Sequence, residues 1–125
     1  DGTATNVLSS FSSSTIGLST GGDAQKNVSG SKYVCYAFKA IPGYSAFGSY
    51  YGNGTTNGEF VYLGFKPAFV MVKVLSDPNY GWVIADNKRG PINENEQSLY
   101  ANSNAAETTN DFNGDFLSNG FKLLY

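Results

Sequence analysis

Five aromatic side chains lie in or beside turn-rich segments of the sequence. The Pro42-Gly43 and Gly52-Asn53-Gly54 runs flank three of them, and Asp77-Pro78-Asn79 precedes the other two. An exposed aromatic face with polar neighbours has the chemistry needed to stack on a sugar ring and bond its hydroxyls. Aromatics in a β-rich domain also pack in the core or pair across strands, which is the alternative interpretation. The predicted glycan-contact residues are Tyr44, Tyr50, Tyr51, Tyr80 and Trp82.

Acidic side chains provide the other candidate chemistry. Asp111, Asn113 and Asp115 have the alternating spacing of oxygen ligands, but no Glu follows at the distance that a calcium-binding helix–loop–helix motif requires. A glycosidase needs two carboxyl groups at a defined separation, and nothing in the sequence sets one. We therefore predict no metal site, no catalytic residue and no cofactor, and we interpret the remaining acids as solvated: Asp77, Asp86, Glu94, Glu96 and Glu107.

Histidine is absent and cysteine occurs once, at Cys35. The missing imidazole excludes Ser-His-Asp triads, Cys–His dyads and His-containing zinc sites. A single thiol forms no disulfide within the chain, and the alternating Tyr33–Phe38 run predicts that Cys35 is buried and inert. These observations favour a protein that is not an enzyme.

The charge pattern argues against two classes of partner. Only 14% of the residues are charged and the net charge is −2, with the lysines scattered along the chain. Nucleic-acid binding normally needs clustered positive charge, so we expect no nucleic-acid partner. No apolar run approaches the roughly 18 residues that span a bilayer, so we also expect no membrane span.

The elements that position these residues are short strands separated by turns. Runs rich in β-branched and aromatic residues predict strands over 16–20, 32–39, 60–63, 69–75, 82–85 and 98–101, with one helical turn at 104–107. This spacing predicts an all-β fold, an antiparallel β-sandwich of jelly-roll type with little helix. The predicted core residues are Phe60, Val61, Phe69, Val70, Val72, Val83 and Ile84.

A likeness within the chain suggests how it is divided. Phe11–Leu18 and Phe116–Leu123 share Phe, Ser, a bulky apolar residue and Leu at the same spacing. We expect residues 1–40 to form a lead-in and hairpin, either the end of a preceding repeat or a strand-donating segment. Residues 41–46 form a joint, and residues 47–125 the main sandwich unit. Because the chain begins at Asp1, we also expect it to be a piece of a longer polypeptide.

Several ordered segments resemble a domain of uncharacterised function in marine bacteriophage virion proteins, often near tail fibres. The likeness runs through residues 33–38, 42–54, 60–73, 82–86, 100–102, 105–107 and 115–123. It implies a location in a virion or outside the cell, and it brings no catalytic motif. In the similar domains a hairpin like residues 22–38 follows the Ser118–Lys122 strand, which implies that the main unit here lacks its last hairpin. The N-terminal hairpin would complete its own unit, or a neighbouring one by strand donation.

These observations leave three functions open. The first is a structural or adhesive module of a virion tail or fibre, built from copies or repeats of itself and contacting host-surface glycans. The second is a self-assembling extracellular filament subunit completed by strand donation. The third is a carbohydrate-binding module of a secreted protein.

Overall fold

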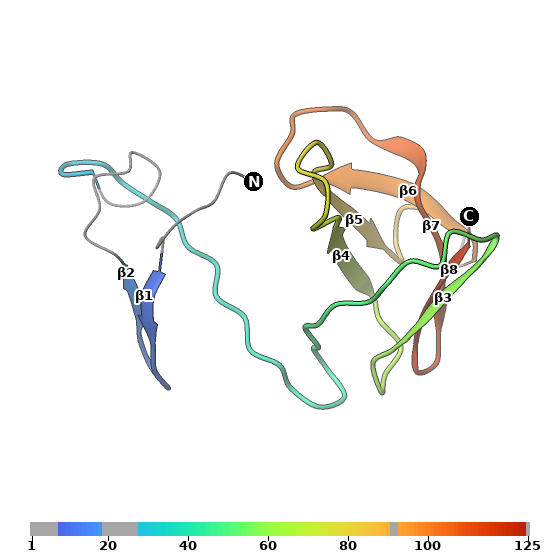
Figure 1. The fold of residues 1–125 in the computed structure, drawn as a ribbon, viewed down its shortest axis with the longest axis horizontal. Coiled ribbons are helices and arrows are strands. Elements are labelled where there is room, and N and C mark those ends of the chain that lie inside the picture. The colour runs from blue at the N-terminus through green and yellow to red at the C-terminus, as the bar shows by residue number, and fades with distance from the viewer. Residues whose placement is uncertain (1–7, 19–27, 91–92, 125) are drawn as a thin grey trace. The chain divides into compact units, whose positions relative to one another are not determined.

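A computed structural model describes residues 8–18, 28–90 and 93–124 (Figure 1). The chain divides into two compact units, Asp1–Phe38 and Lys39–Tyr125, so the predicted joint at 41–46 lies near the start of the second unit. The described residues contain strands and turns and no helix, hence none that could cross a membrane. The predicted helical turn at 104–107 is therefore wrong.

The described residues of the first unit contain one small antiparallel sheet. Strand β1 (Leu8–Phe11) pairs with β2 (Ile16–Leu18), and Phe11 lies opposite Ile16. The Ser12 hydroxyl closes the turn between them by accepting a hydrogen bond from the Thr15 backbone N–H at 2.9 Å. Sequence reasoning placed β2 correctly but interpreted the serine-rich β1 as part of a lead-in, because its serines are weak strand formers.

The second unit is a six-stranded antiparallel sheet with the order β3-β8-β7-β6-β5-β4. Five strands that follow one another in the chain form a meander, and β3 adds beside the last of them. This arrangement confirms the predicted antiparallel, sandwich-like all-β fold. The strands are β3 (Asn57–Tyr62), β4 (Phe69–Lys73), β5 (Trp82–Asp86), β6 (Asn95–Tyr100), β7 (Thr108–Leu117) and β8 (Gly120–Leu124).

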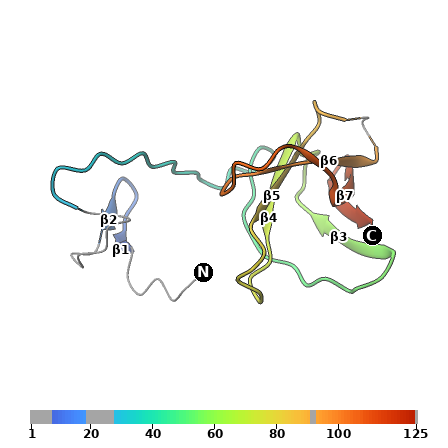
Figure 2. The same cartoon turned by 90° about the horizontal axis from the view of Figure 1, so that it is seen from above.

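The sheet is strongly curled, as Figures 1 and 2 show. Strands β3 and β4 follow each other in the chain but lie at opposite edges, which a flat sheet would hold about 24 Å apart. Residues 63–68 could bridge that distance only as a fully extended chain. They begin instead with a turn, because Gly64 has a φ of 79° and the backbone N–H groups of Leu63 and Gly64 both donate to the Asn119 carbonyl. The curl brings the two edges within reach of this link.

The concave side of the sheet encloses a small aromatic core. Phe112 and Phe116 meet edge to face at 6.0 Å, and Phe112 lies 5.9 Å from Phe121. Val70 and Ala85 complete the buried set. Five partly buried residues pack against it: Val61, Leu63, Val72, Val83 and Leu123.

Four of the seven predicted core residues therefore contribute to the core. Phe60 and Phe69 do not, since their side chains are 41% and 56% exposed. Val61 pairs with Phe121 and Val70 pairs with Ala85, so the alternation of each strand turns Phe60 and Phe69 to the other face. Ile84 lies opposite Met71 on that same face and is partly buried.

The predicted strand over residues 32–39 is absent. Residues 31–40 are exposed and none of them belongs to a strand in the described part of the chain, and Cys35 is exposed rather than buried. The residue types there are typical of a strand, but residue type alone does not make one. A strand also needs a neighbouring strand to complete its backbone hydrogen bonds.

Candidate functional site

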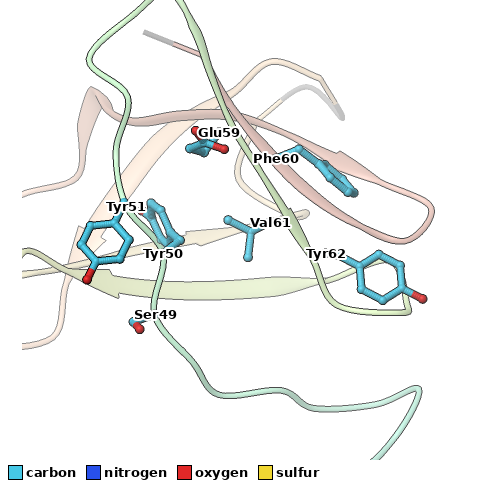
Figure 3. A pocket seen from close by; sticks show the side chains of 7 residues that line it. All are labelled: Ser49, Tyr50, Tyr51, Glu59, Phe60, Val61 and Tyr62. Atoms are coloured by element: carbon cyan, nitrogen blue, oxygen red, sulfur yellow. The ribbon is translucent and has the colours of Figure 1, made fainter.

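An open groove lies between residues 49–51 and strand β3 (Figure 3). Its volume is about 440 Å³. It contains two of the five predicted glycan-contact residues, Tyr50 and Tyr51, and all its residues belong to the second unit. The lining residues are Ser49, Tyr50, Tyr51, Glu59, Phe60, Val61 and Tyr62.

Tyr50 anchors one wall of the groove to the sheet. Its ring meets the core residue Phe121 edge to face, with the ring centres 6.1 Å apart and the planes at 81°. Burial raises the pKa of the Tyr50 hydroxyl above 10.0, so the group remains a neutral hydrogen-bond donor at physiological pH. This contact fixes the backbone of residues 49–51 beside β3.

Tyr51 follows this anchor and is 93% exposed. The next residues form a compact loop that returns the chain to β3. The Asn53 side chain accepts a hydrogen bond from the Thr55 N–H at 3.1 Å and donates one to the Asn57 carbonyl at 3.0 Å. The turn chemistry of asparagine thus places Tyr51 at the rim of the groove.

Strand β3 forms the opposite wall. In Figure 3, Glu59 and Val61 point toward the side of Tyr50, while Phe60 and Tyr62 project from the other side of the strand. Val61 is partly buried and gives the groove an apolar floor, and Glu59 and Ser49 bring polar groups to its two ends. The register shift between Asn57 and Phe60 in the β3–β8 pairing sets the direction of Glu59.

The other predicted aromatics lie away from the groove. Tyr44 is in a tight turn closed by the bridge between Ile41 and Ser45. Tyr80 and Trp82 lie at the end of the β4–β5 hairpin, where the Tyr80 carbonyl accepts a hydrogen bond from Lys73 Nζ and the Trp82 N–H donates to Asn102. The five residues therefore occupy three separate places, and the structure brings together only Tyr50 and Tyr51.

Three of the five acidic residues considered for catalysis, Asp77, Asp86 and Glu107, are engaged in ion pairs or hydrogen bonds. Arg89 bonds Asp86 at 2.8 Å and Glu107 at 2.9 Å, and the hydrogen bond to Glu107, then that to Asp86, raises the pKa of the guanidinium. The Asp77 carboxylate accepts bonds from the N–H and side chain of Asn79. A carboxylate neutralised by arginine is a poor general acid or base, so this arrangement is structural.

The sequence triplet considered for calcium is likewise divided among partners. Asp111 accepts hydrogen bonds from Tyr100 and Thr108, whereas Asp115 lies opposite Lys122 in the β7–β8 pairing. Within the described ranges, no cluster of three or more His, Cys, Asp or Glu side chains could hold a metal ion.

Sequence reasoning missed Ser49, Glu59 and Tyr62 as neighbours of the predicted tyrosines. Glu59 is the only charge in β3, and an isolated charge in an apolar strand indicates an exposed or edge position. That signal could have identified the strand as accessible, but not the segment that faces it.

Comparison with known proteins gives a family but no characterised relative. No curated protein and no solved structure matches the chain. Residues 1–125 match the family described as a domain of unknown function, DUF7483. The chain belongs to this DUF7483 family.

Proposed function

We propose that this protein is a non-enzymatic structural and adhesive module of a bacteriophage tail or fibre that contacts host-surface glycans through the groove. The observation that carries the glycan proposal is the exposed Tyr51 ring at the rim of a groove that also holds the apolar Val61 and the polar Ser49 and Glu59. The virion setting rests on the resemblance of residues 33–123. The neutralised carboxylates favour binding over catalysis.

The groove has the features that a pyranose ring requires. One face of such a sugar presents C–H groups that stack on an aromatic ring, and its hydroxyls bond to polar groups at the edge. Tyr51 would supply a ring at the rim, which projects away from β3 in Figure 3, and Val61 an apolar surface within the groove, while Glu59 would accept hydrogen bonds and Ser49 would accept or donate them. Tyr50 is held by Phe121 and serves to position the wall.

The open shape predicts weak binding by each copy. Tight small-molecule sites enclose most of the ligand surface, whereas this open groove would leave one side of a ligand in solvent. Repetition compensates for weak contacts, because linked copies bind at a high effective concentration. A module used in many copies on a virion therefore needs no deep pocket.

A glycan array probed with a multivalent form of the full chain tests this function. We expect binding to a subset of glycans, and for one of these a loss of about tenfold in affinity with Tyr51→Ala, about 1.4 kcal/mol. Glu59→Gln should also weaken binding. Tyr44→Ala is the matched control, since Tyr44 is exposed but lies outside the groove.

Two results would contradict the proposal. One is the absence of any glycan bound by the multivalent form. The other is an equal loss for Tyr44→Ala and Tyr51→Ala. If a monomeric chain binds as tightly as the multivalent form, the result favours the alternative of a carbohydrate-binding module in a secreted protein.

A further inference from the structure

Glu59 is a partly buried carboxylate without a partner among the described residues. It is the only charged residue of β3, and it lines the groove together with Tyr50. Arg89 pairs with Asp86 and Glu107, but no residue that the structure describes forms an ion pair or a hydrogen bond with the Glu59 side chain. A carboxylate that loses part of its hydration without gaining a partner is unfavourable. A positively charged ligand would compensate for this loss.

The lining of the groove contains no positive charge. It consists of one serine, three tyrosines, Phe60, Val61 and Glu59. Lys122 lies opposite Phe60 in the β3–β8 pairing, and its Nζ donates a hydrogen bond to the Gly58 carbonyl at 2.7 Å. This ammonium group therefore bonds the backbone of β3 and does not neutralise Glu59. The lining residues give the groove a net negative charge.

The Tyr50 ring also favours a cation. In Figure 3 it lies with Glu59 between residues 49–51 and β3. Packing on Phe121 holds the ring in place, and Tyr50 remains 39% exposed. The face of an aromatic ring carries negative charge and attracts cations, most strongly where water is partly excluded. A cation in the groove would therefore be attracted by both a carboxylate and a ring.

We propose that Glu59 makes the groove selective for glycans that carry a protonated amine, such as amino sugars without an acetyl group. This inference rests on the proposed glycan function and names the class of sugar. An ammonium group would form a charge-assisted hydrogen bond with the carboxylate, which is stronger than a bond from a neutral hydroxyl. A sugar carboxylate, sulfate or phosphate would be repelled by Glu59 and would meet no cation in the lining.

Sugars that differ in charge test the selectivity. The multivalent full chain is applied to glucosamine, glucose and glucuronic acid on the same spacer, and to the corresponding galactose series. At about pH 6 the sugar amine is protonated and the sugar carboxyl is ionised. In at least one series we expect the amine to bind about tenfold more tightly than the neutral sugar, and the acid to bind most weakly. Glu59→Gln should abolish the preference, and Glu59→Lys should reverse it in favour of the acid.

Glu94→Gln is the matched control, because it removes the same charge from an exposed position outside the groove. The preference should persist in this variant, and an equal loss in both variants would indicate an effect of overall charge and overturn the proposal. Binding that Tyr51→Ala weakens, but that is confined to neutral or acidic sugars or shows no advantage for the amine, would also overturn it and leave the glycan function intact. If no glycan binds, the glycan function and the selectivity fail together.

Discussion

Residues 31–56, which we call the connecting stretch, and the β7–β8 hairpin (Thr108–Leu124) contain similar aromatic residues in opposite environments. Phe116 and Phe121 in the hairpin are buried, at 1% and 4% exposure, whereas Tyr36 in the connecting stretch is 78% exposed. The connecting stretch contains one isolated bridge and no strand. Alternation gives a segment two faces, but only pairing with neighbouring strands brings one of them onto a core.

The space around the glycines also differs between the two regions. A Cβ added at Gly120 would lie 2.1 Å from the Val61 carbonyl oxygen, and one at Gly114 would lie 2.8 Å from the Lys122 carbonyl oxygen. Nothing lies within 4 Å of the corresponding position at Gly48. The hairpin glycines allow close approach of neighbouring backbones, which the connecting stretch does not require.

Removal of a buried ring should produce the largest contrast. Phe116→Ala should lower the free energy of unfolding by about 3–5 kcal/mol, because it removes buried area and leaves a cavity in a small core. Tyr36→Ala should change it by less than about 0.5 kcal/mol, as expected for an exposed side chain. Urea denaturation followed by fluorescence, at concentrations where the chain is monomeric, measures both.

Equal effects of the two substitutions would contradict the assignment of the core to the hairpin. An effect of Tyr36→Ala that grows with protein concentration would instead locate its role in the association of copies, and would sharpen the comparison.

Substitution of the glycines should give a smaller contrast. Gly120→Ala should cost about 1–3 kcal/mol, because the methyl group would push β8 away from the Val61 carbonyl. Gly48→Ala meets open space and should be neutral within about 0.5 kcal/mol. Thermal denaturation of the two variants provides the measurement, and a neutral Gly120→Ala would show that β3 and β8 are less closely paired than described.

Strands with local signals could be predicted from the sequence, and strands that depend on distant partners could not. The apolar runs of β3, β4 and β5 and the turn at Asn119 were identified from residue type. Strand β7 was missed because Asn110, Asp111, Asn113 and Asp115 disfavour strands. Strand β7 pairs with β6 and β8. In the β6–β7 pairing the register shifts between Thr109 and Gly114, and Asn110, Asp111 and Asn113 lie in this irregular part.

The groove, like the strands, could be predicted only in part from the sequence. Tyr50 and Tyr51 were predicted from their turn-rich surroundings, but Glu59 and Val61 come from the following strand. They meet the tyrosines because Tyr50 packs on Phe121, which is far away in the sequence. A contact of this kind depends on the register of β3 against β8, and residue type alone does not give that register.

The polar contacts of the two regions should differ in their response to pH, which is the smallest expected effect. In the connecting stretch Asn53 bonds Thr55 and Asn57 close by, whereas Asp111 in the hairpin bonds Tyr100 of β6 as well as Thr108. The hydrogen bond from Tyr100, then that from Thr108, lowers the pKa of Asp111 below 3.8. The bond to Asp111 is also the main cause that raises the pKa of Tyr100 above 10.0.

The direction of each pH effect on stability depends on whether the folded or the unfolded state binds the proton more tightly. The stabilisation from Asp111 is present above the ordinary carboxyl pKa and is lost as the pH falls through the lowered value, because the folded state must then take up a proton. The contribution of Tyr100 is present below 10.0 and is lost as the pH rises through its raised pKa. Asp111→Asn should therefore flatten the loss of thermal stability on acidification from about pH 5 to pH 2, and Tyr100→Phe should produce a smaller flattening, because the carboxylate keeps its bond from Thr108. If Asp111→Asn flattens the acid limb while Tyr100→Phe leaves it unchanged, the contact between β6 and β7 does not hold the carboxylate, and the bond from Thr108 within the hairpin accounts for the effect.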